Sequence, residues 1–249
     1  MQVRMREKGE SMTEDRCTAL LLAAGKGLRV GGDVRKQYLE VAGAPLFTYS
    51  VRAMQESPLI TDIVLLVPDG DEEKSREVLA ARNLMEKVRR IMPGGDERYH
   101  TVCLGLEAVD WACDYVFIHD CARPFLDQAT ICRLYEAVRE VGACVAGMPS
   151  KDTVKLTDGD GYVAGTPNRG NVWIVQTPQV FAFDLIREAH RRLMSRLDEL
   201  LEKGISITDD AMVAEQMMHS KIRLVEASYR NIKVTTPEDL VVAEAFLAS

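Results

Sequence analysis

The sequence predicts an α/β protein with a mostly parallel β-sheet flanked by helices and a β-arm that protrudes from it. From Cys17 onward, short β-rich runs alternate with longer amphipathic stretches, and this alternation predicts right-handed βαβ crossovers. The 249 residues are 47% hydrophobic and 28% charged, which is enough for one large α/β domain or two small ones. Residues 149–176 break the alternation, and we expect them to form the arm.

Each expected strand is a short run rich in apolar or β-branched residues. The runs cover residues 17–23, 62–67, 87–92, 115–120, 143–148, 221–227 and 231–235. The expected helices lie at residues 45–56, 71–86, 97–109, 127–141, 183–203, 209–218 and 237–248. Thr236 before Pro237 suits the start of the last helix, and Gly142 and Gly204 suit left-handed positions just past two others.

The arm, residues 149–176, contains two β-prone runs on either side of the sequence TDGDG. Such a sequence predicts a hairpin turn. A lone two-stranded hairpin is only marginally stable in water. We therefore expect the arm to pack on something, and a second copy of the chain is the obvious candidate.

Composition excludes several classes of protein. The net charge of -7 and pI near 5.3 lack the basic excess of general nucleic-acid binders. No apolar run approaches the roughly 18 residues of a membrane span, and residues 1–16 resemble no targeting signal, so we expect a disordered tail on a cytoplasmic protein. The six cysteines contain no C-x-x-C pair and favour reduced, buried thiols. A metal site at Cys113, His119 and Cys121 is a weaker alternative, because a cysteine in an apolar segment is most often simply part of the core.

A glycine-rich loop follows the first strand in the sequence LLLAAGKGLRVGGDVRKQYLEV. Gly25 and Gly27 match the start of a dinucleotide fingerprint, but Val30 occupies its third glycine position. A Walker A loop also fails, because Asp33 stands where lysine is required. What remains is a flexible cationic loop at the carboxyl end of a parallel sheet, the usual place for a ligand. A solvated loop whose cations bind nothing is the alternative.

Several motifs occur in order along the chain: LLLAAGKGLRV, KQYLEVAG, PGGDERYHTV, IHDCARPF, KDTVK, VQTPQVF, TDDA and NIKVTTPEDL. In this order and spacing they resemble the 2-C-methyl-D-erythritol 4-phosphate cytidylyltransferase family of non-mevalonate isoprenoid synthesis. The resemblance covers residues 17–248. It implies a Rossmann-like fold, with a single nucleotidyltransferase domain over residues 17–249.

The resemblance implies transfer of CMP from CTP to 2-C-methyl-D-erythritol 4-phosphate with release of pyrophosphate. A phosphate monoester is largely a dianion at pH 7, so no activated serine or cysteine is needed. Catalysis should consist of alignment and charge neutralisation. By the family pattern, Arg29, Lys36 and Lys233 stabilise the reacting phosphates and Mg²⁺ assists as cofactor. Lys26 and Arg35 are better interpreted as solvated cations.

The expected CTP pocket combines a small-residue wall with one acid. Backbone N–H groups of the glycine loop can approach phosphate oxygens closely. Asp96 can accept from the cytosine amino group, although an ordinary turn-holding aspartate is the alternative. With Asp96, the residues expected to bind CTP are Ala23, Ala24, Gly25, Gly27, Gly94, Gly95, Thr101 and Cys121.

The expected acceptor site combines residues of two subunits. Asp120 resembles the family's substrate-side acid and the one protein ligand of Mg²⁺, which prefers few carboxylates plus phosphate oxygens. Arg123 follows it at the same sheet edge, and Thr177 comes from the same subunit. Thr153 and Arg169 match positions that reach across from the partner's arm. The resemblance therefore implies a homodimer that binds CTP and the methylerythritol ester.

Three other functions stay open at this point. Ribitol-5-phosphate cytidylyltransferase shares the fold and the CTP loop, and few arm residues separate the two. A silent nucleotide-binding module is disfavoured because Arg29, Lys36, Asp120 and Lys233 are all present. A nicotinamide oxidoreductase is disfavoured by the mismatch at Val30.

Overall fold

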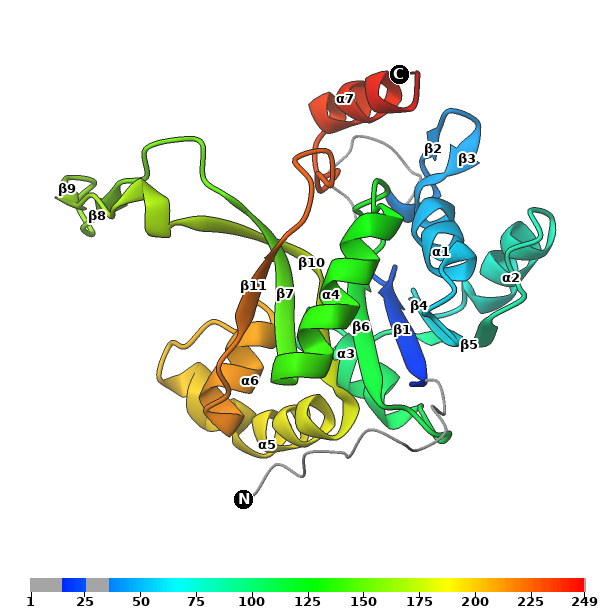
Figure 1. Ribbon diagram of the computed structural model, residues 1–249, viewed down its shortest axis with the longest axis horizontal. Coiled ribbons are helices and arrows are strands. Elements are labelled where there is room, and N and C mark those ends of the chain that lie inside the picture. Colours follow the sequence, from blue (N-terminus) through cyan, green and yellow to red (C-terminus); the bar gives the residue numbers. More distant parts are fainter. Residues whose placement is uncertain (1–14, 26–35, 249) are drawn as a thin grey trace.

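A seven-stranded sheet forms the centre of the protein (Figure 1). The structure is a computed structural model that describes residues 15–25 and 36–248. The strand order is β11-β7-β10-β6-β1-β4-β5. Only β10 pairs antiparallel with its neighbours, β6 and β7. The strands are β1 (Cys17–Leu22), β4 (Asp62–Val67), β5 (Val88–Pro93), β6 (Tyr115–Asp120), β7 (Ala143–Pro149), β10 (Trp173–Ala182) and β11 (Arg223–Glu226).

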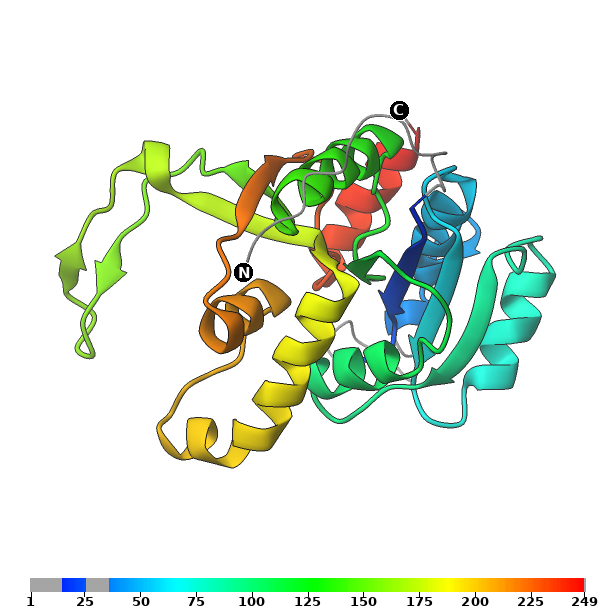
Figure 2. The same cartoon turned by 60° about the horizontal axis from the view of Figure 1, so that its bottom comes forward.

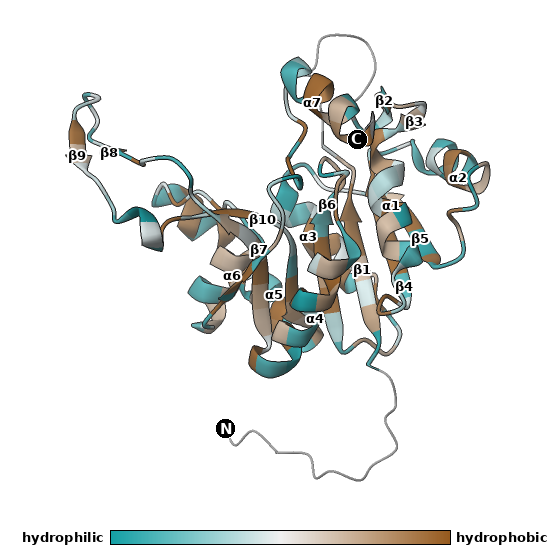
Figure 3. Cartoon of the chain, turned by 45° about the horizontal axis from the view of Figure 1, so that its top comes forward, coloured by the Kyte–Doolittle hydropathy of each residue, from teal (hydrophilic) through white to brown (hydrophobic). Residues whose placement is uncertain are grey.

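Helices cover both faces of this sheet (Figure 2). One face packs against α1 (Leu46–Glu56), α2 (Glu72–Ala80) and α4 (Gln128–Val141). The other packs against α3 (Arg98–Glu107), α5 (Phe183–Glu202) and α6 (Asp210–Met218). Along β1, Leu21 faces the first cluster and Leu20 the second, as the alternation of a strand requires. The strands are accordingly among the most hydrophobic segments in Figure 3.

The last helix, α7 (Pro237–Ala248), packs on a separate small cluster that includes Val41, Leu46 and Val234. Its start is as predicted: the backbone N–H of Thr236 donates to Asp239 Oδ2 at 2.8 Å, which is the reach-back bond of a capping box. Gly142 and Gly204 adopt φ of 76° and 71°. Both predicted left-handed glycines are confirmed.

The strand prediction was wrong at two places. Residues 231–235 form no strand, because the N–H of Val234 donates to the carbonyl of Ala122, outside any sheet ladder. The prediction also missed β10, whose register shifts between Val175 and Gln179. Pro178 lies in this irregularity, where its missing N–H removes no ladder bond. Residues 173–176, expected in the arm, therefore belong to the main sheet.

The predicted hairpin is present and stands away from the body of the molecule (Figure 1). It consists of β8 (Leu156–Thr157) and β9 (Val163–Gly165), followed by the short helix η2 (Arg169–Asn171). In the turn, Asp158 Oδ1 accepts from the N–H groups of Asp160 and Tyr162. Large apolar side chains face solvent on the hairpin, at Leu156, Tyr162 and Val163, and at the start of β10, at Ile174 and Val175.

The beginning of the described chain is tied to the body. Asp15 Oδ2 accepts from the Tyr135 hydroxyl at 2.9 Å, and Arg16 pairs with Asp62 at 2.9 Å. Residues 1–14, which carry most of the expected tail, lie outside the described residues. No helix in the described ranges is both long and apolar enough to cross a bilayer.

The cysteines are all unpaired, but they are not all buried. Cys17, Cys121 and Cys144 lie in the interior, as predicted, and burial raises the pKa of Cys17 to about 12. Cys132 on α4 is exposed, so the expectation of buried thiols does not hold for it.

Candidate active site

A pocket of about 290 Å³ opens at the carboxyl end of the parallel strands. It collects the residues after β1, the turn after β5, the end of β6 and a residue from the distant segment before α7. Ligand sites of open α/β sheets lie at this edge. The lining residues are Leu22, Ala23, Ala24, Gly25, Gln37, Leu46, Gly95, Asp96, Glu97, Arg98, Thr101, Asp120, Cys121, Ala122 and Lys233.

The wall expected to bind the nucleotide is made of small residues in close contact. Of the eight described residues predicted there, all except Gly94 line the pocket: Ala23, Ala24, Gly25, Gly95, Asp96, Thr101 and Cys121. A Cβ at Gly94 would lie 2.3 Å from the Cβ of Ala24, so Gly94 lets the turn close against β1. The N–H of Gly95 then donates to Thr101 Oγ1 at 3.0 Å.

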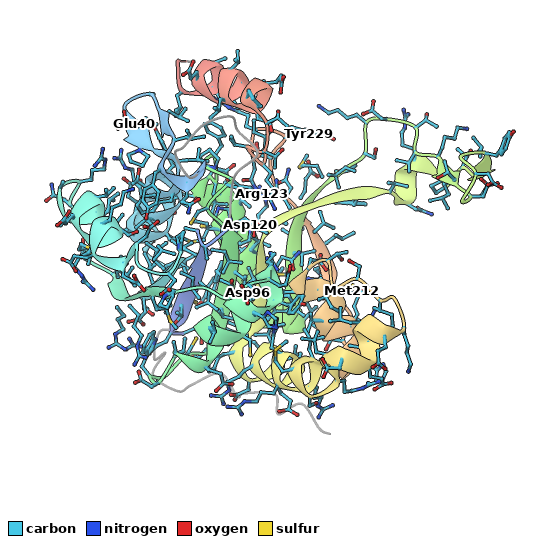
Figure 4. All side chains as sticks on the ribbon, turned by 180° about the vertical axis from the view of Figure 1, so that it is seen from behind. Glu40, Asp96, Asp120, Arg123, Met212 and Tyr229 are labelled. Carbon is cyan, nitrogen blue, oxygen red and sulfur yellow. The ribbon has the colours of Figure 1, made fainter. Side chains whose placement is uncertain are left out.

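Asp120 is the charged centre of the pocket, at the end of β6 (Figure 4). Its Oδ2 accepts from Lys233 Nζ at 2.7 Å, and its Oδ1 accepts from Arg98 Nε at 3.2 Å. Burial by itself raises the pKa of this carboxyl, but the attraction of Arg98 and Lys233 outweighs burial and holds the pKa well below its usual range. Asp120 is therefore a carboxylate with two cations fixed beside it.

Arg98 is the functional candidate that sequence reasoning missed. It begins α3 and bridges two carboxylates, because its NH1 also lies 2.8 Å from Asp210 Oδ2. Burial disfavours the charged guanidinium, yet Asp210 and Asp120 together raise its pKa. Asp210 is 1% exposed and also contacts His190 Nε2 at 3.2 Å. The two ends of this bridge stand in the motifs GGDER and TDDA, but nothing in the sequence indicates that these motifs meet in the fold.

A chain of hydrogen bonds holds the loop that presents Asp120. His119 Nε2 lies 3.1 Å from the carbonyl of Arg123, which can only accept, so this nitrogen carries the proton. His119 Nδ1 must then accept from the Thr177 hydroxyl at 3.0 Å. Thr177 Oγ1 in turn accepts from the backbone N–H of Asp120 at 3.1 Å. Burial lowers the pKa of His119 to about 4, which keeps the ring neutral at pH 7.

Apart from Asp120, the expected acceptor residues do not line the pocket within one chain. The Thr177 hydroxyl is engaged in the bonds just described, and Arg123 NH1 donates to the carbonyl of Asn231 at 2.8 Å. Thr153 is exposed on the arm. Arg169, also on the arm, donates to the carbonyl of Lys151 at 3.3 Å. The structure thus brings Asp120 and Lys233 together and leaves the two arm residues distant from them.

Two of the three predicted catalytic cations, Arg29 and Lys36, have side chains outside the described part of the structure. Arg29 and Gly27 lie in residues 26–35, outside the described residues. Lys36 is described only by its backbone, at the start of the short helix η1 (Lys36–Tyr38). Lys233 is the one whose side chain contacts the pocket's acid.

The chain is similar to known proteins over nearly its whole length. The family model for IspD, 2-C-methyl-D-erythritol 4-phosphate cytidylyltransferase, matches residues 17–249. The chain is 43% identical to the 2-C-methyl-D-erythritol 4-phosphate cytidylyltransferase of Desulforamulus reducens, over 92% of this chain and 94% of that protein. It is 41% identical to the enzyme of the same name from Lachnospira eligens, over 92% and 98%.

Solved structures agree with the sequence matches. The fold is similar to that of 4-diphosphocytidyl-2C-methyl-D-erythritol synthase from Anaerococcus prevotii, with a TM-score of 0.80 and 31% identity over 95% of this chain and 97% of that one. The Thermus thermophilus 2-C-methyl-D-erythritol 4-phosphate cytidylyltransferase gives a TM-score of 0.70 and 29% identity, over 93% and 98%. The chain therefore belongs to the 2-C-methyl-D-erythritol 4-phosphate cytidylyltransferase family.

Proposed function

We propose that this protein transfers CMP from CTP to 2-C-methyl-D-erythritol 4-phosphate and releases pyrophosphate. Membership of the cytidylyltransferase family supports the reaction. The observation that carries it to this chain is the pocket at the sheet edge, where a small-residue wall meets the cations around Asp120. Such a pocket suits a flat base on one side and phosphates on the other.

In the reaction, an oxygen of the substrate phosphate attacks the α-phosphorus of CTP. The new P–O bond forms as the bond from the α-phosphorus to the bridging oxygen breaks, and pyrophosphate leaves. Both reactants are polyanions, so the barrier is dominated by charge and alignment. Lys233 neutralises charge at the α-phosphate, and Arg29 and Lys36 act on the same triphosphate. Asp120 holds Lys233 in place and receives the acceptor's hydroxyl groups.

Selection of cytosine falls to the wall after β1 and β5. Asp96 accepts from the cytosine amino group, while Thr101 and the backbone of Ala23 and Ala24 complete the outline of the ring. Gly94 keeps this slot narrow, because any side chain there would meet Ala24. Cys121 contributes its backbone to the ribose.

Mg²⁺ fits this site as a cation held mainly by the substrate's phosphates. Among the described residues, no three His, Cys, Asp or Glu side chains gather as a metal centre. Asp120 does line the pocket as a carboxylate, and each of its oxygens keeps a lone pair beyond its one bond to a cation. Asp120 would be the single protein ligand. When bound, the ion would neutralise negative charge on the phosphate oxygens.

We further propose that a homodimer completes the acceptor site. The arm holds Thr153 and Arg169 away from the pocket of their own chain and exposes large apolar side chains such as Tyr162, at 74%. An arm laid on a second copy would cover this apolar surface. It would also bring two phosphate-binding side chains to the partner's Asp120.

The proposal is tested by measuring pyrophosphate release from Mg·CTP with a panel of acceptors. We expect release with 2-C-methyl-D-erythritol 4-phosphate and none when ATP replaces CTP. Release with D-ribitol 5-phosphate alone would keep the nucleotide assignment and overturn the acceptor. A protein that is inactive with both esters contradicts the proposed function.

A further inference from the structure

Asn231 is a buried polar residue between the root of the arm and the pocket. It is 1% exposed. Its side-chain nitrogen donates both of its protons, to Gln176 Oε1 at 3.0 Å and to the carbonyl of Thr177 at 2.9 Å. The backbone carbonyl of Asn231 accepts from Arg123 NH1 at 2.8 Å. The side-chain amide thus joins the segment of Asn231 to β10, and the backbone carbonyl of Asn231 joins it to Arg123 in the loop after β6.

The same contacts lead directly to the pocket. Two residues beyond Asn231, Lys233 Nζ contacts Asp120 Oδ2 at 2.7 Å. Thr177, to which Asn231 donates, accepts from the backbone N–H of Asp120 through its hydroxyl. The N–H of Val234 then donates to the carbonyl of Ala122. The segment from Asn231 to Val234 therefore bonds both to β10 and to residues 120–123, at the end of β6 and in the loop after it.

The backbone of Lys233 belongs to no helix or strand, so its position depends on side-chain contacts of the same segment. Residues 231–235 belong to no strand or helix, and the side chain of Lys233 is 43% exposed. A lysine ammonium is a point charge on a flexible four-carbon stem, so its position is set by where its backbone is fixed. The only side chain of this segment with two bonds to the sheet, within the described residues, is Asn231.

We propose that Asn231 is a positioning residue for the transfer reaction, which fixes the Lys233 ammonium at the reacting phosphate. This rests on the proposed function. A misplacement of about 1 Å at a reacting centre costs on the order of 100-fold in rate. Loss of both amide bonds would leave the carbonyl of Thr177 unpaired and release the segment to such a shift.

The root of the arm takes part in this arrangement. Gln176 Nε2 donates to the carbonyl of Ser228 at 3.0 Å, and the Tyr229 hydroxyl donates to the carbonyl of Pro149 at 2.9 Å. Figure 4 shows Tyr229 beside the strand that leads into the arm. The segment that carries Lys233 is therefore tied to β10 and β7 where the arm leaves the sheet.

The test compares Asn231→Ala with Thr18→Val by the turnover number at saturating CTP and methylerythritol ester. Thr18 is equally buried, and its hydroxyl accepts from Trp111 Nε1 at 3.1 Å. It lies at the end of β1 away from the pocket, so the variant controls for loss of a buried hydrogen bond. We expect turnover to fall at least tenfold in Asn231→Ala and less than twofold in Thr18→Val. Equal turnover of Asn231→Ala and the parent enzyme overturns the proposal.

A double-mutant cycle separates positioning of Lys233 from general stability. Single-turnover rates with enzyme in excess are measured for Lys233→Met with and without Asn231→Ala. If Asn231 acts through Lys233, its loss changes the residual rate less than twofold in this background. A tenfold loss in both backgrounds contradicts the proposal.

A folding failure would be separated by circular dichroism. If Asn231→Ala does not fold, Gln176→Met removes one of the two acceptors and is judged by the same two criteria. A parent protein that is inactive with CTP and the methylerythritol ester would overturn the proposed function. An active parent with unaffected variants would overturn only the role of Asn231.

Discussion

Arg98 and His119 show how single residues support the pocket without having been predicted to do so. Arg98 places one guanidinium between Asp120 and the almost fully buried Asp210. A buried carboxylate that loses its cation retains the full cost of its desolvation. His119 instead stays neutral and uses both ring nitrogens to hold the loop that presents Asp120.

We predict that Arg98→Met destabilises the protein by about 3–5 kcal/mol, the range for breaking a buried ion pair from one side. Arg191→Met is the matched control, because Arg191 pairs with Glu107 at 2.7 Å but both side chains are about half exposed. An exposed pair contributes less than about 1 kcal/mol. Urea denaturation measures both values, and equal losses in the two variants would refute the role assigned to Arg98.

His119 predicts an acid-sensitive contribution to stability. Its pKa falls from 6.5 when unfolded to about 4 when folded, so the unfolded state binds more protons between these values. The contribution is intact above pH 6.5 and is lost as the pH falls toward 4. Between pH 7 and pH 5 the loss amounts to about 2 kcal/mol.

The check is the free energy of unfolding at pH 7 and pH 5 in metal-free buffer, for the parent and for His119→Asn. The variant is expected to lose about 2 kcal/mol less than the parent over this range. Asp120 stays ionised throughout, because its pKa is lowered from a usual value that already lies below pH 5. Identical pH dependence in both proteins would show that His119 is not the titrating group.

Among the elements, the arm differs most from the rest of the molecule. Its hairpin is only a few residues long and is held by the Asp158 turn. Its exposed apolar side chains form no part of the clusters that flank the sheet. A hairpin of this kind is marginal by itself, and the proposed dimer supplies the missing partner.

We predict that the parent sediments at twice 27.8 kDa and that the double variant Leu156→Asp, Val163→Asp sediments as a folded monomer. The two positions are 57% and 61% exposed on the arm. Val241→Asp with Val242→Asp, at 68% and 42% exposed on α7, is the control and should remain dimeric. A monomeric parent, or a dimer that only the α7 charges disrupt, would contradict the proposed interface.

Elements with one dominant local signal could be predicted from the sequence. Buried parallel strands such as β4 and β6 are continuous apolar runs, and the predicted bounds 62–67 and 115–120 are those observed. β10 was missed because a proline such as Pro178 argues against a central strand. The register shift of β10 between Val175 and Gln179 is what accommodates Pro178. Residues 231–235 have a strand-like composition, but their bonds go to side chains and a loop, which no local pattern reveals.

For the site, several residues in recognisable motifs lie together at one pocket, whereas the residues that support them were not predicted. Asp96, Asp120 and Lys233 line the pocket, as predicted from motifs in family order. Arg98 and Asp210 stand in quoted motifs too, but their ion pair depends on how α3 and α6 pack on one face of the sheet. Contacts between distant elements are set by tertiary packing and carry no periodic signal.

At the scale of the whole molecule, the fold brings together charges that are far apart in sequence. Lys233 and Asp120 are separated by 113 residues and lie 2.7 Å apart. We propose that the Lys233 ammonium, held in place by Asp120, neutralises phosphate charge during the transfer. The side chain of Lys233 is 43% exposed. Replacing this lysine should therefore leave the fold intact.

The most direct test of this claim is the turnover number of Lys233→Met with CTP and 2-C-methyl-D-erythritol 4-phosphate. Lys203→Met is the control, because Lys203 pairs with Glu199 on the surface at 59% exposure. Loss of one preorganised donor to a developing charge costs about 100- to 1,000-fold in turnover. We predict a loss of that size for Lys233→Met, which should stay folded because Arg98 still pairs with Asp120, and no loss for Lys203→Met. Turnover near that of the parent in a folded Lys233→Met enzyme would contradict the account.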